Sequence, residues 1–269
     1  MSGGLDSGLD SPSAMALSVT MMGSGTSTGV PVIGCACRVC TSEDPRNRRF
    51  RPGLKLEMAT GVVLVDTPID LRQQALRFGL PRLDAVLFTH SHADHIFGLD
   101  DIRIFNFRQR QAIPCYGSAE TLRAIRRAFA YVFESTQEGG GKPQLDLIEV
   151  RAPFSLLGLE VVPVPVWHGE MEVFGYRIGS FAYVTDCNRI PEASYRLLDG
   201  VEVLILDALR YRPHPTHFTI DEALEAAARI AARRTILTHL THEVDHGAPE
   251  APLPAGVEFG YDGLTFDLP

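Results

Sequence analysis

The stretch Thr89-His90-Ser91-His92-Ala93-Asp94-His95 decides the fold class of this chain, and it directly follows a short apolar run. Side chains of a β-strand alternate with period two, so the pattern predicts that His90 and His92 project to one side at a strand's end. The Asp–His pair then follows on the turn. Imidazole and carboxylate groups are ligands of borderline divalent ions, and one short loop holds too many of them for a single tetrahedral metal. We therefore expect two ions here rather than a polar loop with scattered histidines.

Length and composition favour one large α/β core. The chain has 269 residues, of which 45% are hydrophobic, and predicted strands alternate with helical stretches, as in layered α/β domains. We expect a disordered N-terminal tail over residues 1–14 and a single domain over residues 15–269. The formal net charge of −8 and the pI of about 5.6 give no overall attraction to nucleic acid or anionic membranes. Any recognition of phosphate must therefore be local.

Targeting and redox signals favour the cytoplasm. No apolar run approaches the ~20 residues of a transmembrane helix, and the N-terminus lacks a basic-then-apolar signal pattern. The five cysteines are odd in number, and three of them are clustered. Such usage fits metal binding in a reducing compartment better than a secreted disulfide framework. We expect a cytoplasmic protein without membrane contact, and a homodimer is left open.

A glycine-rich run, Gly23-Ser24-Gly25-Thr26-Ser27-Thr28-Gly29, precedes the histidine stretch and follows a strand expected over residues 17–22. Glycine permits tight turns and close approach of the backbone to a ligand. The run is neither a Walker motif nor a dinucleotide-binding loop, because no Gly-Lys-Ser/Thr follows it and it does not open a helix. Direct phosphate contact and an ordinary turn both remain alternatives.

Three cysteines, Cys35, Cys37 and Cys40, lie within six residues of one another. As thiolates they could occupy three corners of a tetrahedral zinc site, which then needs a fourth ligand. The alternative is three reduced, partly buried thiols. Thiols this close together would be open to oxidation without a metal, so we favour zinc.

Further potential ligands recur at the ends of predicted strands. Ligand sites of open α/β sheets gather at the carboxyl ends of strands. The residues found there are Asp66, His168, Asp186 and His239. Asp186 is placed to bridge two metals through its two oxygens, whereas His168 taken alone would more often be an ordinary histidine.

The remaining elements are predicted from periodicity and capping signals. Strands are expected over residues 17–22, 54–58, 62–65, 84–88, 113–117, 145–150, 154–156, 159–165, 174–178, 181–185, 203–206 and 235–238. Helices are expected over residues 71–78, 96–105, 118–133 and 220–232. Gly139-Gly140-Gly141 breaks regular structure, so residues 134–142 are a candidate mobile rim or lid.

The ordered set His90-x-His92-x-Asp94-His95, His168, Asp186 and His239 resembles the metallo-β-lactamase superfamily of binuclear hydrolases, over roughly Leu17 to Leu268. The resemblance implies an α/β fold, the αββα four-layer sandwich with two similar halves. Cys35-x-Cys37-x-x-Cys40 together with Thr238-His239-Leu240-Thr241-His242 is similar to one branch, the phosphoribosyl 1,2-cyclic phosphate phosphodiesterases of bacterial phosphonate breakdown. In that branch three cysteines and the second histidine hold a structural Zn²⁺, which implies His242 as the fourth ligand.

The resemblance also implies the division of ligands at the active site, where Mn²⁺ or Zn²⁺ is expected. One ion is assigned to His90, His92 and His168, and the other to Asp94, His95 and His239, with Asp186 bridging the two.

Two further roles follow from the resemblance. Asp66 matches the superfamily's first motif, which supports the ligands from behind. His217 matches the position of a catalytic histidine and is expected, with Asp186, to be catalytic. His214 and His246 are expected to be ordinary polar residues.

We expect hydrolysis of a small, cyclic phosphodiester such as phosphoribosyl 1,2-cyclic phosphate or a cyclic nucleotide, because two metals activate water near neutral pH and clamp phosphate oxygens. The alternatives are a thioester or lactam hydrolase on the same fold, an RNA 3′-processing nuclease and a non-catalytic metal-holding module. No long arm for docking transfer RNA is recognisable, so nucleic acid is not an expected partner. The segment Ser118–Lys142 differs from the named phosphodiesterases and should border the site, which leaves the exact substrate open.

Overall fold

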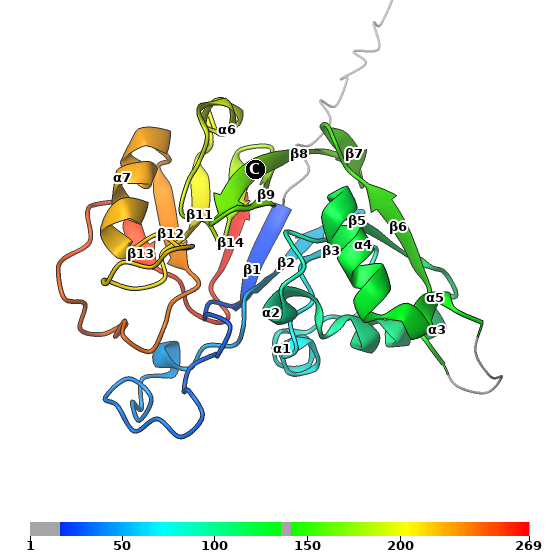
Figure 1. Cartoon of the computed structure of the whole chain (residues 1–269), viewed down its shortest axis with the longest axis horizontal. Coiled ribbons are helices and arrows are strands. Elements are labelled where there is room, and N and C mark those ends of the chain that lie inside the picture. Colours follow the sequence, from blue (N-terminus) through cyan, green and yellow to red (C-terminus); the bar gives the residue numbers. More distant parts are fainter. Residues whose placement is uncertain (1–16, 136–140, 269) are drawn as a thin grey trace, which may run out of the picture.

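Two β-sheets face each other in the computed structural model, which describes residues 17–135 and 141–268 (Figure 1). Within those residues each sheet has seven strands. In spatial order the first sheet contains β14 (Thr265–Leu268), β1 (Leu17–Gly23), β2 (Gly53–Met58), β3 (Gly61–Val65), β4 (Ala85–Leu87), β5 (Ile113–Gly117) and β6 (Leu145–Glu149). The second contains β13 (Val257–Phe259), β12 (Arg234–Thr238), β11 (Val203–Asp207), β10 (Phe181–Val184), β9 (Met171–Ile178), β8 (Leu159–His168) and β7 (Phe154–Leu156). The tail expected over residues 1–14 lies outside the described residues.

Both sheets are buried on both faces, because apolar side chains occupy successive positions of their central strands. In β3, Val63 and Val65 pack into the core between the sheets, whereas Leu64 packs into an outer core. In β11, Ile205 faces the inner core and Leu204 the other outer core. The period-two geometry of a strand therefore builds three apolar layers from near-continuous apolar runs.

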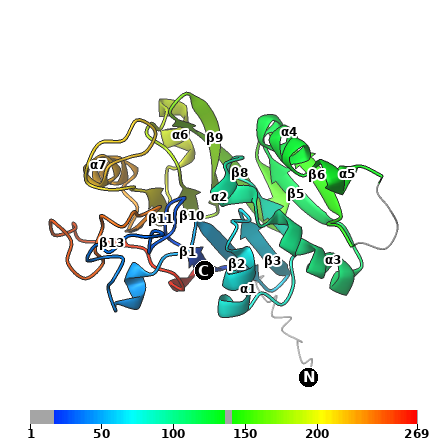
Figure 2. The same ribbon diagram turned by 60° about the horizontal axis from the view of Figure 1, so that its bottom comes forward.

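Helices cover the two outer faces. The outer core of the first sheet takes side chains from α1 (Leu71–Phe78), α2 (Ala93–Ile96), α3 (Arg103–Gln109), α4 (Ala119–Ala128) and α5 (Ala130–Phe133). The second sheet is covered by α6 (Glu192–Leu197) and α7 (Ile220–Ile230), and short 3₁₀ turns lie at η1 (Pro45–Asn47) and η2 (Leu99–Ile102). Figure 2 shows the two helical layers on opposite sides of the paired sheets. The expected αββα sandwich is confirmed. Among the described residues, no helix has the length and apolarity needed to cross a membrane.

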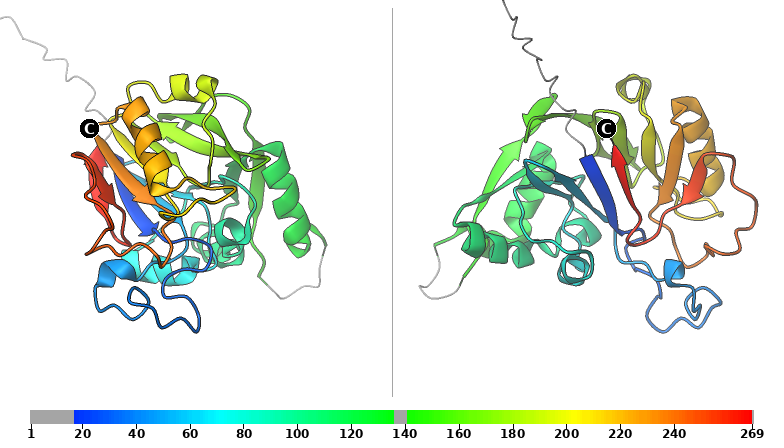
Figure 3. Two further views of the ribbon diagram at one scale, coloured as in Figure 1. Left: turned by 60° about the vertical axis from the view of Figure 1, so that its left-hand side comes forward. Right: turned by 180° about the vertical axis from the view of Figure 1, so that it is seen from behind.

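The two sheets repeat one connection pattern. Antiparallel strands come first, and β3 to β6 and then β10 to β13 are parallel. β14 closes the first sheet beside β1 (Figure 3). Parallel strands deliver their carboxyl ends to the same edge of a sheet, which is where open α/β sheets place ligands. Across the two sheets, the Tyr176 hydroxyl donates to the Phe88 carbonyl at 2.8 Å, just before the histidine stretch.

Two helix predictions were wrong in their extent. The helix expected over residues 96–105 is divided into α2, η2 and α3, because the chain turns at Gly98, whose amide donates to the Thr67 carbonyl at 2.8 Å. A Cβ on Gly98 would lie 2.0 Å from the Pro68 carbonyl oxygen, so only glycine fits this turn. The helix expected to run to residue 133 breaks at Phe129, which leaves helical geometry at φ −114° and ψ 43°.

The observed limits of the strands differ less from the predicted limits than those of the helices do. β8 extends to His168, so this histidine ends a strand rather than following it. The short strands β13 and β14 were not predicted. Of the candidate lid at residues 134–142, residues 136–140 lie outside the described part of the chain.

Candidate active site

Side chains that follow strands of both sheets meet at the edge where the parallel strands have their carboxyl ends. The seven residues predicted as active-site ligands form two groups, and both include Asp186. The groups are His90, His92, His168 and Asp186, and Asp94, His95, Asp186 and His239. Within each group, the atoms able to bind a metal all lie within 4.8 Å of one another. The structure thus brings together the same two sets that the resemblance implied.

Three of the strand-end residues adopt left-handed backbone conformations. The φ angles are 64° at Asp66, 53° at Asp186 and 63° at His239. A residue with a Cβ pays for positive φ, and such strain persists where the surrounding structure fixes it, often at functional sites. Tight turns therefore end β3, β10 and β12 and hold these side chains at the common edge.

Asp66 orients two of the imidazoles from behind. Its Oδ2 lies 2.7 Å from His95 Nδ1 and accepts the Thr89 hydroxyl at 2.8 Å. The same hydroxyl lies 3.0 Å from His90 Nδ1, and because its proton points to Asp66, it accepts the N–H of His90. In their neutral forms both rings therefore carry the proton on Nδ1, which leaves the Nε2 lone pair directed to the centre. Such outer hydrogen bonds fix the tautomer of metal-binding histidines.

The third histidine of the first group is oriented by the backbone. His168 Nδ1 lies 2.8 Å from the Thr216 carbonyl and donates to it, which leaves Nε2 free. Burial lowers the pKa of His90, His168 and His239, and so favours the neutral imidazole that binds metals. His95 differs: burial opposes its charge, but the surrounding carboxylates, Asp186 first, raise its pKa well above the ordinary value. Metal binding at His95 would displace a proton.

The donor set fits divalent ions. At this edge of the sheets, three buried nitrogens of the candidate ligands have no hydrogen-bond partner among the described residues, namely His90 Nε2, His95 Nε2 and His239 Nδ1. They lie 3.8, 3.3 and 3.1 Å, respectively, from the carboxylate oxygens of Asp186. A buried polar atom without a partner costs about 1–3 kcal/mol. Ions held between these nitrogens and the shared carboxylate would satisfy all three.

His217 lies at the same edge without belonging to either ligand group. Its Nε2 is 4.0 Å from Asp186 Oδ2, and its Nδ1 is 3.1 Å from Asp207 Oδ1. Burial lowers the pKa of His217, but the charge and hydrogen bond of Asp207 outweigh it and raise the pKa to about 9. Cations bound beside it would lower this pKa again. The His214 ring lies beside that of His217, with 5.1 Å between the ring centroids and an interplanar angle of 52°, whereas His246 belongs to neither ligand group.

Asp207 is the site residue that sequence reasoning missed. Its carboxylate is fully buried and also accepts the backbone N–H groups of Asp186 at 3.0 Å and Phe218 at 3.1 Å. It therefore links the shared ligand to the loop that carries His217. The sequence did contain a signal for this residue, because Asp207 directly follows a predicted buried strand, as Asp66 and Asp186 do.

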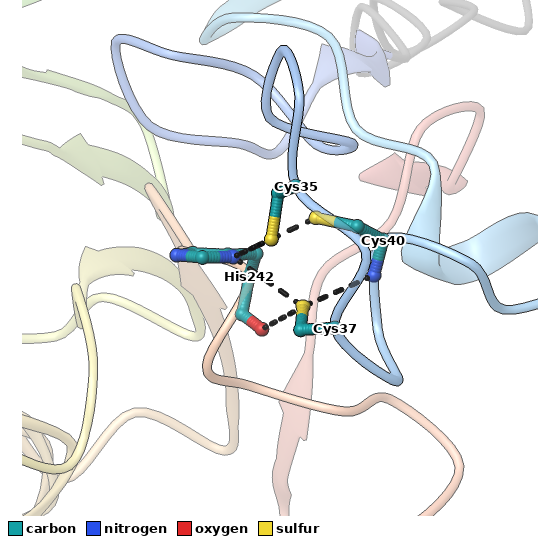
Figure 4. A group of neighbouring side chains, drawn as sticks. All are labelled: Cys35, Cys37, Cys40 and His242. Carbon is teal, nitrogen blue, oxygen red and sulfur yellow. Dashed lines mark hydrogen bonds between the residues drawn. The ribbon is translucent and has the colours of Figure 1, made fainter.

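A second cluster lies where the loop between β1 and β2 meets the loop after β12. The Sγ atoms of Cys35, Cys37 and Cys40 lie 3.3, 3.4 and 3.6 Å from His242 Nδ1 (Figure 4). A tetrahedral zinc with three thiolates and one imidazole has a sulfur-to-nitrogen edge of about 3.5 Å. The four side chains fit that geometry.

Local hydrogen bonds favour thiolate formation at one of these cysteines. The Cys40 amide donates to Cys37 Sγ at 3.4 Å, which is the main cause that lowers the pKa of Cys37 to about 6. Burial raises the pKa of Cys40 to about 11. Arg49 lies on the same loop as the cysteines, and its buried guanidinium donates to two carbonyls of the other loop, those of Thr241 at 3.0 Å and Val244 at 2.8 Å. Arg49 therefore holds the loop that carries His242 against the cysteine loop.

The glycine-rich run serves structure rather than phosphate contact at most of its amides. Those already engaged within the fold are the amides of Ser24, Gly25, Thr26 and Gly29. Gly25 also pairs with Leu240 in an isolated bridge beside His239. The backbone N–H groups of these four residues already donate hydrogen bonds within the protein, so they cannot donate to a phosphate. At these positions the run therefore serves as an ordinary turn.

Comparisons with known proteins agree with this geometry. The family described as "Beta-lactamase superfamily domain" matches residues 62–240. The chain belongs to the metallo-β-lactamase superfamily. A solved structure described as a new diphosphatase from the PhnP family is 43% identical, with a TM-score of 0.89, and the match covers 94% of this chain and 98% of that one. Superfamily membership and the His/Asp clusters together indicate a metal-dependent hydrolase.

Two other proteins are similar to this chain over most of its length. The octanoyltransferase of Porphyromonas gingivalis is 40% identical over 249 residues, which cover 91% of this chain, and the chain spans only 50% of that protein's length. The Zn²⁺-bound PqqB of Methylobacterium extorquens is 20% identical with a TM-score of 0.73, and covers 93% of this chain and 100% of its own. At 20% identity, this similarity shows a shared fold and nothing more.

A substitution in the cysteine cluster tests the structural zinc. Cys37→Ser should remove about one zinc per chain and lower the free energy of unfolding by several kcal/mol, since structural zinc sites contribute roughly 10–16 kcal/mol to folding in small peptides. Elemental analysis and thermal unfolding measure both effects. Cys115→Ala, which changes a buried thiol outside the cluster, should retain zinc. Unchanged zinc content and stability in Cys37→Ser would refute the assignment.

Proposed function

We propose that this chain is a binuclear metal-dependent phosphodiesterase acting on a small phosphodiester. The observation that carries the proposal is the shared position of Asp186, between two groups of metal-binding atoms, with His217 Nε2 4.0 Å from its carboxylate. Metal ions held by these groups would stabilise negative charge on a substrate, and His217 would transfer a proton at the same place. The PhnP-family diphosphatase relative supports chemistry at phosphorus.

The proposed ligands are the two groups that share Asp186, and Cys35, Cys37, Cys40 and His242 are the proposed ligands of a structural zinc. When bound, two divalent ions lower the pKa of water and neutralise charge on phosphoryl oxygens. Asp186 holds the two groups in register, and Asp66 fixes the imidazole tautomers through the hydrogen bonds described above. We propose Mn²⁺ or Zn²⁺ at the active site.

The leaving oxygen of an alkyl phosphodiester needs a proton, and we assign its delivery to His217. Because Asp207 accepts from Nδ1, the Nε2–H of the protonated ring faces the centre. Asp207 thus orients the acid and stabilises its charge, and its bond to the Asp186 amide sets the position of the acid relative to the ligands.

Small cyclic phosphodiesters, such as phosphoribosyl 1,2-cyclic phosphate or a cyclic nucleotide, are the proposed substrates. Hydrolysis of a phosphoanhydride is a second candidate, favoured by the description of the 43% identical relative as a diphosphatase. We further propose a single domain over residues 15–269 that acts in the cytoplasm on a small molecule, without nucleic-acid or membrane partners. Whether it acts as a monomer or homodimer does not alter the site, whose ligands come from one chain.

A substrate panel tests the reaction class. Metal-loaded protein should hydrolyse bis(p-nitrophenyl) phosphate and a cyclic phosphodiester, and should act far more slowly on a thioester or a cephalosporin, because the paired ligand groups suit a charged phosphoryl centre. Spectrophotometric rates decide this. Activity confined to the thioester or cephalosporin would overturn the proposal.

The role of His217 is tested by a ratio of rates. General acid help is worth about 10²–10⁴ in rate and matters most for a poor leaving group. His217→Ala should therefore lose turnover strongly on a cyclic phosphodiester with an alkoxide leaving group, and much less on a p-nitrophenyl ester, with both active-site metals retained. His214→Ala is the matched control and should change neither rate strongly. Equal losses on both substrates would indicate positioning, and loss of metal would make His217 a ligand.

A further inference from the structure

A cavity of about 240 Å³ lies where the loop between β1 and β2 meets the last turn of α1 and the turn between β13 and β14. None of the candidate metal ligands lines it, and neither do the residues that orient those ligands. Its charged lining residues are Arg48, Arg49, Arg77 and Asp262. Three guanidinium groups therefore share one small space with a single carboxylate.

Two of these arginines are exposed and lack a polar partner. Neither Arg48 nor Arg77 forms a hydrogen bond or an ion pair through its guanidinium group with any described residue. The guanidinium of Arg77 lies instead over the rings of Phe50 at 5.7 Å and Phe78 at 5.1 Å, measured to the ring centroids. Such stacking holds the group in place and leaves its N–H donors free.

The third arginine is buried and incompletely satisfied. Only 2% of the surface of Arg49 is exposed. Its terminal nitrogens donate to the carbonyls described above and to Asn47 Oδ1, but its Nε has no hydrogen-bond partner among the described residues. Burial lowers the pKa of Arg49 to about 10, so the group stays charged at neutral pH. A buried N–H without a partner is unfavourable, and an acceptor in the cavity would satisfy it.

The carboxylate of Asp262 does not supply that acceptor. Its Oδ1 accepts the amide of Ser24 at 2.9 Å and the hydroxyl of Ser24 at 2.8 Å, and its Oδ2 accepts the amide of Phe50 at 2.6 Å. Both oxygens are therefore engaged by the neighbouring backbone turns rather than by an arginine. Burial also raises the pKa of Asp262 to about 7, so its negative charge is incomplete near neutral pH. The cavity keeps an excess of positive charge.

We propose that this cavity binds a small oxyanion, either inorganic phosphate or the phosphate group of a phosphomonoester. A guanidinium group presents its N–H donors in a planar fork that matches two oxygens of a phosphate. The volume of about 240 Å³ is smaller than the roughly 300–1,000 Å³ of pockets that enclose drug-sized ligands, which favours a small occupant. Because Arg49 also holds the loop that carries His242, a bound anion would stabilise that loop. The inference does not depend on the proposed function.

Calorimetric titration with inorganic phosphate tests the site. Metal-loaded parent protein should bind phosphate at two places, the metal-binding edge and the cavity, and Asp186→Ala should keep only the cavity site. In Asp186→Ala, the added pair Arg48→Gln and Arg77→Gln should weaken phosphate at least about 10-fold, since hydrogen bonds to charged groups are lost. The matched control pair is Arg72→Gln and Arg108→Gln, which removes the same charge from exposed arginines of the groove between α1 and α3. The control pair should leave the affinity unchanged.

Absence of phosphate binding in folded Asp186→Ala, or equal weakening by the two arginine pairs, would overturn the inference. If Asp186→Ala does not fold, the parent decides: the Arg48 and Arg77 pair should remove one of its two phosphate sites, and the control pair neither. If the proposed function fails and the parent binds phosphate once, that single site should still respond to the Arg48 and Arg77 pair. Ribose 5-phosphate separates the two sources of the anion. Its binding at the cavity would identify a phosphomonoester, and binding of inorganic phosphate alone would identify the free ion.

Discussion

Asp186 holds a carboxylate inside the sandwich with only 2% of its surface exposed, and the whole site is built to accommodate that group. Burial opposes its charge, but the neighbouring imidazoles, His239 first and then His95, lower its pKa well below the ordinary value. A buried charge persists only when it is paired and hydrogen-bonded. The Thr185 hydroxyl donates to it at 2.6 Å, and its own amide donates to Asp207. Divalent ions would complete this compensation, since the imidazoles face Asp186 with unpartnered nitrogens.

The residues that surround the Asp186 carboxylate come from both sheets. Asp186 and His239 follow strands of the second sheet, whereas His90 and His95 follow a strand of the first. Neither sheet can form the site alone, so the apolar core between them is a precondition for chemistry. The cysteine cluster acts at a distance, because it joins the loop after β1 to the loop that continues from His239. Its contribution is to hold one end of β12 in place.

Much of the site was predictable because its ligands lie in local patterns. Residues that directly follow strongly apolar strands, such as Asp66 and His239, could be placed at the sheet edge from sequence alone. The turn at Gly98, the helix break at Phe129 and the role of Asp207 could not, because each depends on a contact made only in the folded chain. Gly98 is set by the Pro68 carbonyl, and Asp207 becomes significant only when the Asp186 amide and His217 meet it.

Metal reconstitution tests the central claim most directly. Protein stripped by a chelator should keep its cysteine-bound zinc, since thiolate ligation is tight and closed. Turnover of bis(p-nitrophenyl) phosphate should be lost and should return on titration with Mn²⁺ or Zn²⁺, with a break at two equivalents per chain. Asp186→Ala, with its core strands intact, should show neither the break nor the turnover. Full activity without added metal, or a parent-like titration in Asp186→Ala, would contradict the account.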